Sequence, residues 1–134
     1  MKKRLFISAK QSIILLRISL AIIFLTHSIT RIANSTIEQF GGFMESKGFI
    51  YGTSWVLGIT SFELIGGLLL AFGYFPRVIS IGFILMLIVG IILIHASLGW
   101  FVGEHGTGGS EYSFILIMSL LVISTNENQN QINN

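Results

Sequence analysis

The chain has 134 residues, which is room for one domain. Hydrophobic residues make up 52% and charged residues 10%, with a net charge of +2 and a mean hydropathy of +0.81. A soluble domain of this size cannot bury so much apolar surface, so the composition excludes an ordinary soluble enzyme and a disordered protein. The charges are also too few for a nucleic-acid-binding module. The bilayer is the solvent that suits this sequence.

Four apolar segments are candidates for membrane-spanning helices. They cover about 12–30, 52–72, 77–98 and 110–125. A spanning helix needs about 20 residues, so the first three qualify and the fourth is short. Residues 79–94 are apolar on all sides, which excludes the alternating strands of a membrane barrel. The sequence predicts an all-α integral membrane protein in which residues 1–125 form a four-helix up-down bundle.

Basic residues predict the orientation of the bundle. The basic start at residues 1–4 would also suit a cleaved signal peptide, but Lys10 and Arg17 interrupt the apolar run that follows, which favours a retained first helix. With the N-terminus in the cytoplasm, five basic residues lie inside and two lie outside, as the positive-inside rule expects. The inner set is Lys2, Lys3, Arg4, Lys10 and Arg77, and the outer set is Arg31 and Lys47. Four spans then place both termini in the cytoplasm.

The segments between the spans differ in length and composition. Residues 73–77 form a tight turn with the sole proline, whereas residues 32–51 are long enough for a short amphipathic helix on the outer surface. Residues 103–109 are rich in glycine and contain Glu104 and His105, which we interpret as a connector. The polar tail at 126–134 is expected to be disordered. In the second span, three small residues predict close helix packing: Gly58, Gly66 and Gly67.

Charged side chains within the spans are the most informative feature of the sequence. Each costs about 2.5–3.5 kcal/mol near the bilayer centre, so they are expected to face the interior of the bundle. Arg17 lies about 7 Å to the cytoplasmic side of its helix centre and Glu63 is level with the centre of its own helix, a gap that the two long side chains can close. We predict that they form an intramembrane ion pair, with another donor to Glu63 as the alternative. Such a pair could serve only to set the register of the helices.

A second group of polar residues is expected at the outer end of the bundle. His27 lies about 7 Å outward of its helix centre and His95 about 11 Å outward, which places their rings at similar levels. Arg31 follows His27 by one turn, and Glu111 begins the fourth segment. We predict that these four residues bind a ligand, although each histidine could instead hold helices together through a hydrogen bond. The sequence identifies no catalytic residue.

The absence of cysteine limits the redox chemistry of the chain. It excludes disulfides, iron–sulfur clusters, thiolate metal sites and covalently attached haem. No spacing typical of a metal site is present either, so no metal is expected. A haem held between His27 and His95 is a minor alternative. Any redox role must therefore use a bound cofactor or a partner.

Several segments together resemble the DoxX family of small bacterial four-helix membrane proteins. They are LLRISLAIIFLTHSITR at 15–31, ELIGGLLLAFG at 63–73 followed by Pro76 and Arg77, the segment 95–100, and GGSEY at 108–112. The resemblance places residues typical of the family at Arg17, His27, Glu63, Gly66, Gly67 and Glu111. Ser28 stands where the family usually has glycine, and Arg31 stands where it usually has lysine.

The resemblance implies a multi-pass protein of the bacterial cytoplasmic membrane. Members are linked to thiosulfate and quinone oxidoreduction, which implies an accessory subunit of a quinone-linked redox system that binds a quinone-like molecule at the outer end of the bundle. The chain would act as a homo-oligomer or within a larger membrane complex, without nucleic acid. A non-catalytic scaffold or assembly subunit is the alternative. A carrier of protons or small solutes is less favoured because the chain has neither a repeat nor a broken helix.

Overall fold

The computed structural model describes residues 6–103 and 108–132, whose regular secondary structure is helical, with no strand among them. The predicted all-α class is therefore confirmed for the described part of the chain. Glu104 and His105 of the glycine-rich connector lie outside it. Five α-helices follow one another, with two short helical turns after the fourth. They are α1 (Ala9–Ala33), α2 (Ile37–Ser46), α3 (Gly52–Phe72), α4 (Pro76–Gly90), η1 (Ile91–His95), η2 (Ala96–Leu98) and α5 (Ser110–Ile132).

Helix α1 begins at a capping box formed by Ser8 and Gln11. The Gln11 amide N–H donates to Ser8 Oγ at 3.3 Å, and the Ser8 amide donates to Gln11 Oε1 at 2.8 Å. These bonds satisfy backbone donors that the first helical turn leaves free. The helix buries one face, whose residues recur at helical spacing: Leu20, Ala21, Phe24 and Ser28.

Helix α2 is the short helix that the sequence predicts within residues 32–51. It is docked on the start of α3, where Gly41 and Gly52 are both buried and their backbones approach so closely that neither position has room for a Cβ. The Gly52 amide also donates to Glu45 Oε1 at 3.1 Å, which caps a helix whose preceding residue, Tyr51, supplies no side-chain cap. The link between α2 and α3 is therefore made by backbone contact.

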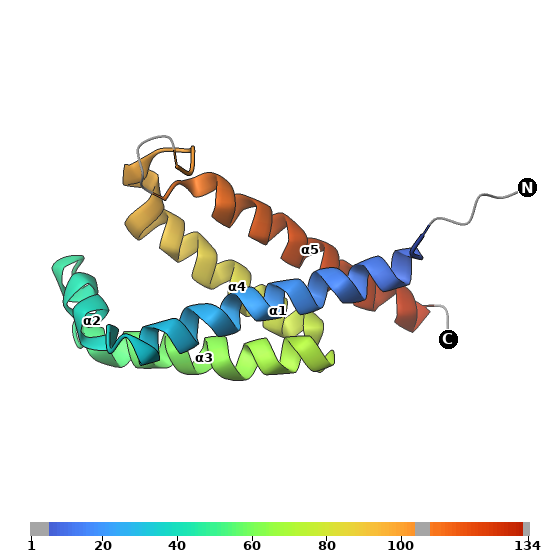
Figure 1. The fold of residues 1–134 in the computed structure, drawn as a ribbon, viewed down its shortest axis with the longest axis horizontal. Coiled ribbons are helices and arrows are strands. Elements are labelled where there is room, and N and C mark those ends of the chain that lie inside the picture. The colour runs from blue at the N-terminus through green and yellow to red at the C-terminus, as the bar shows by residue number, and fades with distance from the viewer. Residues whose placement is uncertain (1–5, 104–107, 133–134) are drawn as a thin grey trace, which may run out of the picture.

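A tight turn joins α3 to α4, as the sequence predicts. Gly73 ends α3 with φ at 81°, a left-handed conformation that favours glycine, and Phe75 also has a positive φ of 49°. Pro76 then opens α4, where its missing N–H removes nothing from the helix. The turn places the end of α3 beside the start of α4, and the two helices diverge beyond it (Figure 1).

The long helices pack as two pairs. Helix α1 packs mainly on α3, and α4 packs mainly on α5. Figure 1 shows the pairs close together near the α3–α4 turn and diverging toward the end that carries α2. Between them, the rings of Phe24 and Phe83 stack at 3.8 Å and form the centre of a core that includes Leu70 and Leu120. The start of α1 and the end of α5 lie at the same end of the molecule (Figure 1).

Two of the three glycines predicted to pack helices do so. A Cβ at Gly66 would lie 3.2 Å from Phe83 Cζ, and one at Gly67 would lie 2.9 Å from Leu25 Cγ. At Gly58 a Cβ would meet no heavy atom within 4 Å. Gly58 therefore faces open space within this chain, and its predicted role in helix packing stays a prediction.

Three helical segments are long and apolar enough to cross a membrane: Ala9–Ala33, Gly52–Phe72 and Pro76–Leu98. These match the first three predicted spans closely. The apolar part of α5, Ser110–Asn126, is shorter, as the sequence indicates. Beyond it the backbone stays helical to Ile132, whereas the sequence predicts a disordered tail from residue 126. An amide-rich segment can continue a helix that is already nucleated by a preceding apolar run, since propagation is easier than nucleation.

Candidate functional site

A large apolar cleft lies between the two diverging helix pairs. Its volume is about 810 Å³. Side chains from α2, α3, α4 and η1, the segment between α2 and α3, the end of α1 and the start of α5 line it, and most of them are aliphatic or aromatic. Its polar lining residues are few: Arg31, Ser54, Glu63, His95 and Ser113, with the phenol of Tyr51. A mostly apolar cavity with a few polar groups is typical of a site for a small organic molecule.

The ion pair between Arg31 and Glu63 is the main polar feature of the cleft. Arg31 Nη1 donates to Glu63 Oε2 at 2.6 Å and to Thr60 Oγ1 at 2.8 Å, and the guanidinium lies over the Phe40 ring at 5.4 Å. The exposed fractions of the side chains are only 14% for Arg31 and 6% for Glu63. Both described hydrogen bonds use Nη1, so the three N–H groups on Nη2 and Nε are left as donors for a ligand.

The predicted pair between Arg17 and Glu63 does not form. Arg17 precedes Arg31 by 14 residues, which is about 21 Å along a helix. The antiparallel packing of α1 on α3 brings Arg31 beside Thr60 and Glu63, whereas the Arg17 guanidinium lies beside Gly73, where a Cβ would be 2.6 Å from Nη1. The alternative, another donor to Glu63, is the observed arrangement. The C-terminus of α3 carries a partial negative charge, which favours the positive charge of Arg17 beside it.

The four residues predicted to bind a ligand are divided between different surroundings. Arg31 and His95 both line the cleft. His27 instead lines a second cavity of about 410 Å³ with Arg31, Phe40 and the threonines Thr26, Thr30 and Thr36, although it is near enough to Glu63 for an electrostatic interaction. Glu111 accepts a hydrogen bond from the Val102 amide at 2.8 Å, so it holds the segment that precedes α5.

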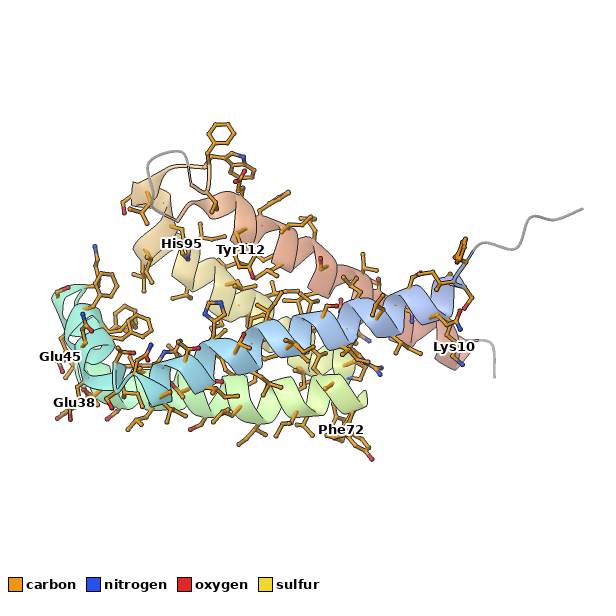
Figure 2. All side chains as sticks on the ribbon, in the orientation of Figure 1. Lys10, Glu38, Glu45, Phe72, His95 and Tyr112 are labelled. Carbon is orange, nitrogen blue, oxygen red and sulfur yellow. The ribbon has the colours of Figure 1, made fainter. Side chains whose placement is uncertain are left out.

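His95 occupies an unusual backbone position at the edge of the cleft. It ends η1, a single turn of π-helix, and such turns are frequent at functional sites. Figure 2 shows His95 near the start of α5, at the same end of the molecule as α2. Its Nδ1 is buried with no hydrogen-bond partner among the described residues. A buried polar atom without a partner calls for an explanation, and a bound polar ligand is one.

Sequence reasoning missed several residues that line the cleft or contact its ion pair. Thr60 precedes Glu63 by three residues and so shares its helix face, which is a signal that could have linked it to the ion pair. Phe40 and Trp55 gave no such signal, since isolated aromatics are common at membrane interfaces. Gly90 lies within an apolar run and also lines the cleft. Gly90 lines the cleft only because α3 and α4 diverge, and no local sequence pattern predicts that divergence.

Comparisons with known proteins bear on the family of the chain. The family model described as DoxX matches residues 12–96, which is more than half of the sequence and includes Arg17, His27, Arg31, Glu63 and His95. No match was found among curated proteins or among solved structures. The match confirms the resemblance in the sequence, and the chain belongs to the DoxX family.

Proposed function

We propose that this chain is a multi-pass protein of the bacterial cytoplasmic membrane that binds a quinone-like molecule and serves a larger membrane redox system. Helices α1, α3, α4 and α5 would each cross the bilayer as an up-down bundle. Lys10 on α1 and Phe72 at the end of α3 lie at the end opposite α2 (Figure 2). Together with Arg77 at the start of α4, Lys10 makes this end basic, which supports a cytoplasmic location for both termini.

The cleft supports this proposal more than any other observation. It offers apolar walls to a ring or chain and hydrogen-bond donors to polar oxygens, which is the combination that a quinone requires. Arg31 and His95 would donate to the quinone carbonyls, and Glu63 would hold Arg31 in place. The unpartnered Nδ1 of His95 fits a residue that is kept for binding, since a buried polar atom without a partner costs stability. A bound quinone would carry electrons for the partner proteins.

His27 and Glu111 would then support the binding site without contacting the ligand. His27 lies near Glu63 and lines the neighbouring cavity, and Glu111 positions the segment that follows η2. Neither has to touch the ligand. We regard Arg31, Glu63 and His95 as the binding residues, and no residue as catalytic.

Tryptophan fluorescence can test the binding directly. The chain has two tryptophans, of which Trp55 lines the cleft and Trp100 does not. In the Trp100→Phe variant, a benzoquinone with a ten-carbon chain should quench Trp55 saturably in lipid vesicles. In the Trp55→Phe variant the quenching of Trp100 should rise only in proportion to the quinone dissolved in the bilayer. Equal, unsaturable quenching of both tryptophans would refute the proposal.

A scaffold or assembly subunit is the second candidate function. The Arg31–Glu63 pair supports it, because this pair joins α1 to α3 without any ligand. In that case the cleft binds no quinone, while Glu63→Gln releases a subunit that copurifies with the unmodified protein. Purification from membranes with both proteins, followed by identification of the attached subunits, distinguishes the two functions.

A further inference from the structure

The cleft opens sideways between α3 and α4, and its rim is apolar. On the α3 side, Tyr51 and Trp55 line the cleft and are 76% and 54% exposed. On the α4 side, Leu85 and Val89 line it and are 60% and 46% exposed. These helices are among the three that can cross a membrane. Exposed apolar side chains at a cavity mouth therefore face hydrocarbon and not water.

Two glycines widen this opening. Gly58 on α3 and Gly90 on α4 both line the cleft, and a Cβ at either position would meet no heavy atom within 4 Å. Other glycines on the same helices behave differently, since a Cβ at Gly67 or Gly82 would lie 2.9 Å or 2.6 Å from a neighbouring side chain. Gly58 and Gly90 therefore leave space at the opening, whereas the others allow close packing.

The ion pair of the cleft is buried, unlike this rim. Glu63 is 4% exposed and its partner Arg31 is largely buried, whereas the rim residues are exposed. A ligand that fits both regions has a polar ring and an apolar chain. The ring would meet the buried donors, and the chain would follow the apolar surface out to the lipid.

We infer that the opening between α3 and α4 is a lateral portal to the bilayer. A chain-bearing, lipid-soluble quinone reaches the cleft through it from the hydrocarbon and keeps its alkyl chain there. Gly58 and Gly90 set the width of the portal and so determine which ligands pass. This inference rests on the proposed function, because it assigns a route and a ligand class to the same cleft.

Leucine at either glycine tests the portal without a predicted clash. All variants carry Trp100→Phe, so that Trp55 reports binding, and are compared in vesicles of phosphatidylethanolamine and phosphatidylglycerol. Gly58→Leu and Gly90→Leu should each raise the Kd of a benzoquinone with a ten-carbon chain by about tenfold. For the same ring without a chain, the Kd should change by less than about threefold. Gly42→Leu is the matched control, because a Cβ at this exposed position on α2 also meets nothing within 4 Å and lies outside the cleft.

The possible results separate the portal from the proposed function. Saturable quenching with the same Kd in the wild type, Gly58→Leu and Gly90→Leu overturns the portal and leaves quinone binding intact. Absence of saturable quenching in the wild type overturns both. Native mass spectrometry adds an independent measurement: a phospholipid that stays bound when quinone is added would show that the cleft takes a structural lipid instead. Thermal unfolding of each variant verifies that the leucine side chain has not disrupted the fold.

Discussion

Arg31 on α1 and Glu63 on α3 are joined by a hydrogen bond of 2.6 Å between Nη1 and Oε2, in a part of the molecule where both side chains are largely buried. Thr60, one turn before Glu63, accepts a second hydrogen bond from the same nitrogen. This arrangement satisfies both N–H groups on Nη1 and places a charged pair at the wall of an apolar cleft. It ties α1 to α3.

Removal of one partner of this pair should be far more harmful than removal of both. Glu63→Leu leaves the Arg31 cation buried and unpaired, which should lower the free energy of unfolding by about 3–5 kcal/mol. The double variant Arg31→Leu with Glu63→Leu should recover most of that loss, because apolar side chains can replace a buried ion pair. Unfolding of the purified protein in detergent measures both effects.

Glu38→Leu serves as the control for that series. Glu38 lies exposed in the first turn of α2, where its charge interacts only with the helix N-terminus, so its loss should cost less than about 1 kcal/mol. If Glu63→Leu costs as little as Glu38→Leu, the ion pair does not stabilise the fold.

The stacked rings of Phe24 and Phe83 should dominate the stability of the contact between the helix pairs. Phe83 has no exposed surface and also packs against Phe62 at 4.8 Å. Phe83→Ala leaves a cavity and should lower the free energy of unfolding by about 3–5 kcal/mol. Ile81→Ala, on the exposed face of the same helix, should have a much smaller effect in the same thermal unfolding measurement. Equal losses would mean that the rings are not the centre of the core.

Adjacent glycines on α2 should respond in opposite ways to alanine. At Gly41 a Cβ would lie 2.5 Å from Thr53 Oγ1 and 2.7 Å from the Thr53 backbone, so Gly41→Ala must push α2 away from α3 at a cost of about 1–3 kcal/mol. Gly42→Ala meets nothing and should be neutral or slightly stabilising, because alanine favours a helix. Limited proteolysis within residues 37–51 should increase only in Gly41→Ala. Equal proteolysis of the two variants would argue against the docked position of α2.

His95→Phe should separate a binding role from a structural role. The substitution removes a ring nitrogen that is buried without a described partner, so the thermal stability should stay the same or rise. The Kd for the chain-bearing quinone should rise by about tenfold, because the imidazole that binds the quinone in the proposed function is lost. Tyr112→Phe, which removes a polar group outside the cleft at the same end of the molecule, should leave the Kd unchanged. A loss of stability without a change in Kd would assign His95 to the fold.

The sequence by itself determined the class of the protein, its helices and its family. Apolar runs and the turn at Gly73 and Pro76 are local signals, and the predicted span at 52–72 coincides with α3. The motifs at 15–31 and 63–73 were also sufficient to indicate the DoxX family. These conclusions needed no knowledge of how the helices pack, because solvent and backbone geometry act on each segment separately.

The tertiary structure alone decided which polar groups meet. Helices that are apolar on all sides carry little information about their rotation, so the sequence could not tell whether Arg17 or Arg31 would reach Glu63. The antiparallel register of α1 and α3 selected Arg31. The divergence of the two helix pairs then placed His95 in the cleft and His27 in another cavity, and left Gly58 facing open space. Packing between distant segments determined which side chains meet, since depth along a helix does not specify the direction in which a side chain points.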